Sequence, residues 1–414
     1  MPFGRYSVGG FDTDYRVYDL AILFVFGYYF ANETVVKELL RLLRQKKLFT
    51  WWLKVLMILL VLSVFVSLFF GGYDFLLPRL IRLYRFLAYL SIPFLVLAVV
   101  RSRDQYIKLF NLLFFLISLV GVIAFLQGLN VLPNFWPEYW RAMYSENDAP
   151  VATLSPHHKH IGVVMLVGVC LGMGYFFLVR SVALKLIIVV LILIMFTVPL
   201  FAGTRTYMLG FAGVLPALLI IGRINLVVPL SVFLIMGWLA IGLGGEQVVE
   251  KVERKYEKRV ASRIERFGYE GLYRERTVIY FDIVRALNEH PYLLVTGTGY
   301  QNIFAFIRAN GAHNNFLQAL MELGLAGLIV FIGFLVTFWR NIRKLMQAKD
   351  KGISIRAQYT WVAFCGILMT MFVGETFWGQ AAMFTLAGQL SFLFALAVSP
   401  YYWLHRYQNK LNFF

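Results

Sequence analysis

Long apolar runs separated by short polar segments make up most of the chain. Several runs hold about 18 or more residues with almost no charge, which is long enough for an α-helix to cross a bilayer. Lipid satisfies no backbone polar group, so such spans must form their hydrogen bonds internally. We therefore predict an all-α polytopic membrane protein with about 11–12 transmembrane helices and one large helical loop between them. The expected spans cover residues 17–33, 51–71, 79–100, 109–127, 161–179, 186–202, 207–222, 226–243, 316–338, 358–374 and 381–399.

The longest polar insertion divides the chain into three parts. An N-terminal transmembrane bundle (1–243) is followed by the loop (244–315) and then by C-terminal transmembrane helices (316–414). Within the loop, apolar residues recur at helical spacing over 246–266 and again over 274–290. The apolar side of the second helix is expected to comprise Val278, Tyr280, Phe281, Ile283, Val284 and Leu287. The loop is therefore expected to be folded.

Composition supports a membrane protein: 60% of the 414 residues are hydrophobic and only 15% are charged. The formal net charge of +17 comes largely from short loops such as 37–47, as expected for loops on the cytoplasmic side, and gives no reason to expect nucleic-acid binding. Arg82 and Arg85 at one span start are expected to reach the interface or a lipid headgroup phosphate. The two cysteines suggest neither a disulfide framework nor a metal site, and the N-terminus does not resemble a removable signal peptide.

Two short motifs raise the question of a bound metal. Asp12-Thr13-Asp14 is a literal DxD, which can hold a divalent cation in nucleotide-sugar transferases, but a three-residue pattern is weak evidence. The cluster His157-His158-Lys159-His160 suggests metal by composition. For the DxD motif we favour a polar lead-in to the first span, and for the histidine cluster a basic edge near lipid phosphate. We therefore predict no metal and no other cofactor.

Candidate chemistry is concentrated near the loop. Arg276 lies in the first turn of the predicted 274–290 helix, where backbone amides and a guanidinium together favour an anion, although a surface salt bridge explains it equally well. His313-Asn314 directly precedes a span. An imidazole has an unperturbed pKa of roughly 6.5, which suits a general base near neutral pH. A single histidine at an interface is more often structural, so its neighbours decide the interpretation.

Three motifs resemble the O-antigen ligase and O-antigen polymerase superfamily of bacterial inner-membrane enzymes. His313-Asn314, nine residues, then Gly324-x-x-Gly327 is similar to the ligase signature. Arg276, fifteen residues before Pro291, and then Gly297-Thr298-Gly299 resemble a second family segment, with three extra residues (294–296) before the glycines. Gly203-Thr204-Arg205 resembles the Ser/Thr-Arg pair at the end of a mid-chain span.

The resemblance implies a glycosyltransferase in the bacterial inner membrane with its site facing the periplasm. Arg205 and Arg276 would bind the diphosphate of an undecaprenyl-diphosphate-linked glycan, and His313 would activate a hydroxyl of lipid A–core or another glycan acceptor. Arg274, Asn314, Tyr207 and Tyr300 are further candidates for binding the substrate. No metal or nucleotide is needed, because the diphosphate is a good leaving group, and direct displacement would invert the anomeric carbon.

Three other functions stay open. A polymerase would extend the undecaprenyl-linked chain instead of transferring it to lipid A–core. A polysaccharide transporter would need charges lining a path through the bundle, whereas most charges here lie in loops and no inverted repeat is evident. The third alternative is a non-enzymatic membrane scaffold. The signature of His313 and the two glycines favours the ligase.

Overall fold

The computed structural model describes residues 2–8, 11–16, 27–44, 48–71, 76–100, 102–129, 131–133, 159–201, 205–223, 225–226, 231, 276–307 and 311–372. Its elements are β1 (Pro2–Val8), β2 (Phe11–Arg16), α2 (Glu33–Arg44), α3 (Leu48–Gly71), α4 (Leu76–Val99), α5 (Arg103–Gly128), α7 (Lys159–Leu178), α8 (Val182–Phe201), α9 (Arg205–Ile220), α12 (Arg276–Glu289), α13 (Leu293–Thr296), the 3-10 turn η3 (Ile303–Ala305), α14 (Asn315–Met346) and α15 (Lys351–Met371). Apart from the short hairpin, the regular elements of these residues are helical, so the predicted all-α polytopic class is confirmed.

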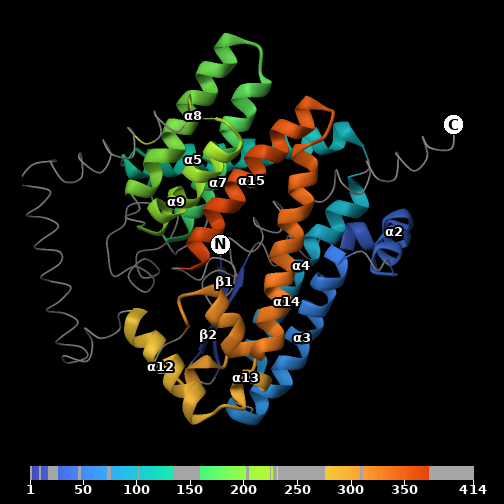
Figure 1. Ribbon diagram of the computed structural model, residues 1–414, viewed down its shortest axis with the longest axis vertical. Helices are drawn as coiled ribbons and strands as arrows, with labels where there is room; N and C mark the ends of the chain where they lie inside the picture. Colours follow the sequence, from blue (N-terminus) through green and yellow to red (C-terminus); the bar gives the residue numbers. More distant parts are fainter. Residues whose placement is uncertain are drawn as a thin grey trace, which may run out of the picture.

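The helices pack into two groups that meet at α14 and α15 (Figure 1). In the first group, α3 packs against both α4 and α14. In the second, α15 packs against α7 and α9, while α8 packs against α5 and α7. The contact between α14 and α15 joins the groups, so helices from both halves of the sequence share one apolar core.

Six of the described helices are long and apolar enough to cross a membrane, and they correspond to predicted spans. They cover Trp51–Phe70, Arg79–Val99, Arg103–Gly128, Ile161–Leu178, Val182–Pro199 and Asn315–Met346, with a shorter apolar helix at Leu209–Ile220. The protein is thus a multi-pass membrane protein. The expected span 358–374 corresponds to α15, which is not among the six; α15 packs against α7, α9 and α14, and a helix covered by protein can be less apolar than one that faces lipid. The expected span 381–399, nearly all of 226–243 and most of 17–33 lie outside the described residues.

The basic segment 37–47, which we expected to be a loop, is mostly helical as α2. Val35 and Leu39 are spaced one turn apart and are both buried, and α2 packs against α4. Loop charge indicates a side of the membrane but not a backbone conformation, so the prediction was wrong about structure. The spacing of the two apolar residues carries the helical signal.

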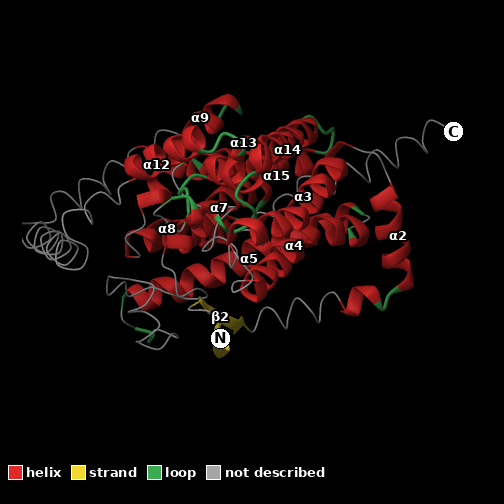
Figure 2. Ribbon diagram, turned by 90° about the horizontal axis from the view of Figure 1, so that it is seen from below, coloured by secondary structure: helices red, strands yellow, loops and turns green. Residues whose placement is uncertain are grey.

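The N-terminal residues, which we expected to be a polar lead-in to the first span, form a hairpin. β1 and β2 pair antiparallel, with Tyr6 opposite Thr13 and Ser7 opposite Asp12. Figure 2 shows the hairpin at the margin of the helical bundle. The DxD motif therefore lies on a strand, and the alternative that it holds a metal is not tested.

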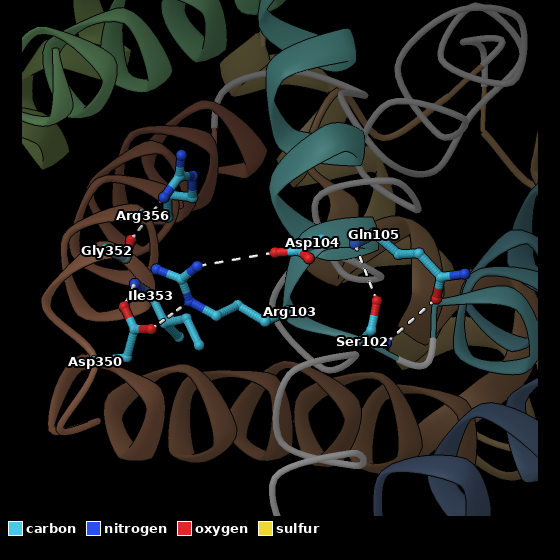
Figure 3. A network of polar contacts seen from close by, with 8 residues as sticks. All are labelled: Ser102, Arg103, Asp104, Gln105, Asp350, Gly352, Ile353 and Arg356. Atoms are coloured by element: carbon cyan, nitrogen blue, oxygen red, sulfur yellow. Dashed lines mark hydrogen bonds and ion pairs between the residues drawn. The ribbon is translucent and has the colours of Figure 1, made fainter.

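Polar side chains join the start of α5 to the start of α15 (Figure 3). Ser102 and Gln105 form a capping box on α5, and Asp350 caps α15 by accepting from the N–H of Ile353 at 3.0 Å. The Arg103 guanidinium donates to the Asp350 carboxylate. Burial raises the pKa of this carboxyl, but the hydrogen bonds from Arg103 and from backbone N–H groups, with the charge of Arg103, outweigh burial and hold the pKa below its usual value.

Replacing Asp350 with alanine should lower the free energy of unfolding by about 1–2 kcal/mol, because the cap and the ion pair are both lost. Asp350→Asn keeps an acceptor oxygen for Ile353 and should cost less. Since the folded-state pKa is lowered, the carboxylate stabilises the protein above its unfolded-state pKa, and this stabilisation is lost as the pH falls through the folded-state pKa. Thermal unfolding in detergent at pH 7 and near pH 3 measures both effects. Equal stability of the alanine and asparagine variants at pH 7 would argue against the cap.

Candidate active site at the start of α14

The described residues of 276–323, which are 276–307 and 311–323, fold around an apolar core of their own. This core consists of Ile279, Ile283, Ala286, Ile303, Ile307, Ala312 and Met321. The unit is attached to the end of α3, where the Phe70 ring stacks on Tyr292 and meets Phe306 edge-on. In Figure 1, α12 and α13 lie toward the same lower end of the molecule as the end of α3. We call this end of the bundle, where α3 and α15 finish and α4, α9 and α14 begin, the site end.

The expected helix 274–290 is present as α12, but part of its apolar side was assigned wrongly. Ile279, Ile283 and Ala286 are buried, whereas Phe281 is 70% exposed and Val284 is also exposed. The buried residues follow the i, i+4, i+7 spacing of a helix face, so periodicity is more informative here than the size of the apolar side chain.

The turn 297–299 is bound to a break in α14. At Gly324 the backbone leaves helical geometry, with φ 67° and ψ −170°, so the expected span 316–338 is two helical segments rather than one. The break frees carbonyl groups of the preceding turn, and two successive N–H groups of the 297–299 turn donate to the carbonyl oxygens of Met321 and Glu322 at 2.7 and 3.1 Å. The turn therefore replaces hydrogen bonds that the kink removes.

Glycine is required on both sides of this contact. A Cβ on Gly297 would lie 2.4 Å from the carbonyl oxygen of Glu322, and one on Gly324 would lie 2.5 Å from that of Val295. Both residues also have positive φ, which favours glycine. Two of the motifs found in the sequence, Gly-x-Gly and Gly-x-x-Gly, thus meet in space and hold the start of α14 in place.

His313 directly precedes α14 and has an exposed side chain. Its φ is 49°, an uncommon left-handed value for a residue other than glycine. Asn314 caps the helix: its Oδ1 accepts from the N–H groups of Phe316 and Leu317 at 2.9 and 3.1 Å, and its Nδ2 donates to the carbonyl oxygen of Phe372 at 3.0 Å. Both ends of the Asn314 amide therefore bond within the protein, and its role as a substrate ligand stays a prediction.

Packing of α9 against α15 places Arg205 at the same end of the bundle. A Cβ on Gly213 would lie 2.3 Å from the carbonyl oxygen of Cys365, and one on Gly210 would lie 3.3 Å from the Thr370 methyl group. The helices are therefore antiparallel and in backbone contact, so the start of α9 at Arg205 is level with the end of α15. The end of α15 also binds the start of α14, because Asn314 and Asn315 donate to the carbonyl oxygens of Phe372 and Met371.

The structure describes the other candidates to different degrees. Arg276 is the first residue of α12, as expected, and Tyr207 lies in the first turns of α9. For these two residues and for Arg205 the structure gives the helix position only, and Arg274 lies outside the described residues. Arg205, Arg276 and His313 thus each lie at or immediately before the start of a helix, where backbone N–H groups favour an anion.

A buried polar network at the site end was not found from sequence. Arg79, only 2% exposed, donates to the carbonyl oxygen of Ser67 at 3.0 Å and to Oδ1 of Asn302 at 2.9 Å. Arg82, expected at the lipid interface, instead donates to Oε1 of Gln301 at 2.6 Å. The signal was two arginines one turn apart in an apolar helix, which in a membrane protein usually face other protein groups.

Tyr300 is buried, which corrects its assignment as a sugar ligand. Its side chain has no exposed surface, and its ring stacks on Phe86. Burial raises the pKa of the Tyr300 phenol well above its usual range, and the nearby Glu322 carboxyl raises it further. The residue is therefore a neutral part of the core that supports the turn above it.

The metal hypotheses are not tested by this structure. Among the described residues no group of histidine, cysteine and carboxylate side chains could hold a metal ion. His157 and His158 lie outside those residues, and for His160 only its position in α7 is described.

The fold is that of a multi-pass helical membrane protein, and its candidate site lies where several helices begin around the 297–299 turn. Residues 190–332 match the family model described as O-antigen ligase, about a third of the chain. This match confirms the resemblance to the O-antigen ligase superfamily over that part of the chain, and it supports a membrane function of the ligase or polymerase type. A comparison with curated proteins found no match.

Proposed function

We propose that the protein is an O-antigen ligase that transfers a glycan from undecaprenyl diphosphate to lipid A–core in the bacterial inner membrane. One observation carries the proposal: the O-antigen ligase match spans Arg205, Arg276, the 297–299 turn and His313 in a single stretch. The structure supports it by bringing the starts of α9 and α14 together against the end of α15.

In the proposed reaction, His313 takes the proton of an acceptor hydroxyl as its oxygen attacks the anomeric carbon. The bond between this carbon and the diphosphate oxygen breaks, and undecaprenyl diphosphate leaves with the electron pair. Arg205 and Arg276, aided by the helix starts on which they lie, stabilise the growing negative charge on the diphosphate. The acceptor oxygen displaces undecaprenyl diphosphate directly, so the anomeric configuration of the transferred sugar inverts.

The site would face the periplasm and accept the lipid donor from the side. A polyprenyl chain loses about 0.8 kcal/mol for each methylene that leaves the bilayer, so the donor must keep its tail in the membrane during the reaction. The remaining substrate candidates, Arg274, Tyr207 and Asn314, would contact the glycan or the diphosphate.

Reconstitution tests this proposal. Purified protein in proteoliposomes is mixed with undecaprenyl-diphosphate-linked glycan, with and without lipid A–core, in EDTA and without nucleotide. We expect glycan to appear on lipid A–core only when lipid A–core is present. Longer glycan that remains on undecaprenyl diphosphate would identify a polymerase instead. Glycan that only crosses the membrane would favour a transporter and contradict the proposed enzyme.

A further inference from the structure

A path of hydrogen bonds runs from Glu322 to the backbone N–H of Ala312, the residue before His313. Nε2 of Gln318 donates to Oε1 of Glu322 at 2.6 Å, and Oε1 of Gln318 accepts from the backbone N–H of Ala312 at 2.6 Å. Gln318 and Glu322 lie one turn apart on the first segment of α14 and are 2% and 1% exposed. Two polar side chains are thus buried to hold one backbone amide.

The two hydrogen-bond partners fix the orientation of the Gln318 side-chain amide. A backbone N–H only donates, so the oxygen of Gln318 must face Ala312. Its nitrogen is then directed at Glu322, whose carboxylate accepts. Of the two orientations of the Gln318 amide, related by exchange of its oxygen and nitrogen, Glu322 therefore stabilises the one that directs the oxygen at Ala312.

The backbone that this path holds is strained. Among the described residues, Gln301 and His313 are the two that have positive φ without being glycine. Such a conformation persists only when its surroundings enforce it. The residues on either side of His313 are both held, Ala312 by Gln318 and Asn314 by its cap and by Phe372.

We propose that Gln318 is a positioning residue for His313, and that Glu322 fixes the Gln318 amide. This inference rests on the proposed function, in which His313 receives the proton of the acceptor hydroxyl. Without the hydrogen bond from the Ala312 N–H, the backbone that leads into His313 is no longer held. The φ of His313 then relaxes toward an ordinary value and moves the imidazole away from the acceptor. Donor binding is assigned to arginines on other helices, so the loss falls on kcat and not on the KM for the donor.

The test uses Gln318→Met, which keeps the side-chain length but makes no such hydrogen bonds. We expect kcat for glycan transfer to fall about tenfold, while the KM for the donor stays within about twofold. Gln127→Met is the matched control: Gln127 is also buried and donates to the carbonyl oxygen of Pro133, but in α5, and its loss should leave kcat unchanged. Glu322→Gln keeps an acceptor and should have a nearly normal kcat, whereas Glu322→Leu should lower kcat as Gln318→Met does. This second pair of variants tests the proposal if Gln318→Met does not fold.

Two readouts separate positioning from a general loss of structure. In a His313→Ala background, Gln318→Met should cause no further loss of the residual transfer, because the residue being positioned is gone. Labelling of His313 by diethyl pyrocarbonate, followed by peptide mass spectrometry without substrate, should change in rate in Gln318→Met but not in Gln127→Met.

Each contrary result overturns a different claim. An unchanged kcat and labelling rate in Gln318→Met would reject the positioning role while an active wild type leaves the proposed function standing. An equal loss in the His313→Ala background would make Gln318 merely structural. Full activity of His313→Ala would instead reject the proposed base.

Discussion

Replacing His313 with alanine should reduce glycan transfer at least about 100-fold, the usual minimum contribution of a general base. The side chain is exposed in front of α14, so its removal leaves no cavity and the protein should remain folded. The loss should appear in kcat, because the imidazole acts on the acceptor hydroxyl and not on the diphosphate. Initial rates in proteoliposomes at saturating donor measure it, with protein recovery and thermal unfolding recorded alongside.

His290→Ala provides the matched control. His290 belongs to the same unit and is also partly exposed, but its ring lies against Tyr292 and Phe306. Its loss should slightly lower stability and leave kcat within about twofold, since packing and not proton transfer is affected. Similar activity in both variants would remove His313 from the mechanism.

The sequence allowed prediction wherever the signal was local. Uninterrupted apolar runs identified the described spans because crossing a bilayer needs about 20 apolar residues whatever the neighbours are. The helix α12 was predicted from its periodicity and from the His290-Pro291 stop, and α12 ends at Glu289. The motif residues His313 and Gly324 were found by their spacing, and both have positive φ in the structure.

What the sequence could not supply was pairing over long separations. Arg79 and Asn302 are 223 residues apart, and nothing near either residue indicates the other. The break at Gly324 was missed because the apolar pattern continues through it, and only the approach of the 297–299 turn makes the break favourable. Tyr300 was assigned to sugar because an aromatic residue in a polar loop is usually accessible, but the unit 276–323 folds back onto α3 and buries it.

Replacing Gly299 with alanine should lower the free energy of unfolding by about 2–5 kcal/mol, which combines left-handed backbone strain with overpacking. Gly299 has φ 85°, and a Cβ there would lie 2.3 Å from the backbone nitrogen of Ser67 on α3. Backbone cannot move aside as a flexible side chain does. The turn must therefore leave α3, and the hydrogen bonds from Gly299 to Glu322 and from Tyr300 to Ser63 weaken with it. Thermal unfolding in detergent measures the change in stability.

Gly222→Ala separates the two causes. Gly222 has φ 71°, but no atom lies within 4 Å of the Cβ position, so alanine there adds strain alone and should cost about 1–2 kcal/mol. The excess cost at Gly299 measures how closely the turn approaches α3. Equal costs at the two positions would mean that this approach is absent. Because the same turn holds the α14 segment that follows His313, Gly299→Ala should also lower transfer per folded molecule, and Gly222→Ala should not.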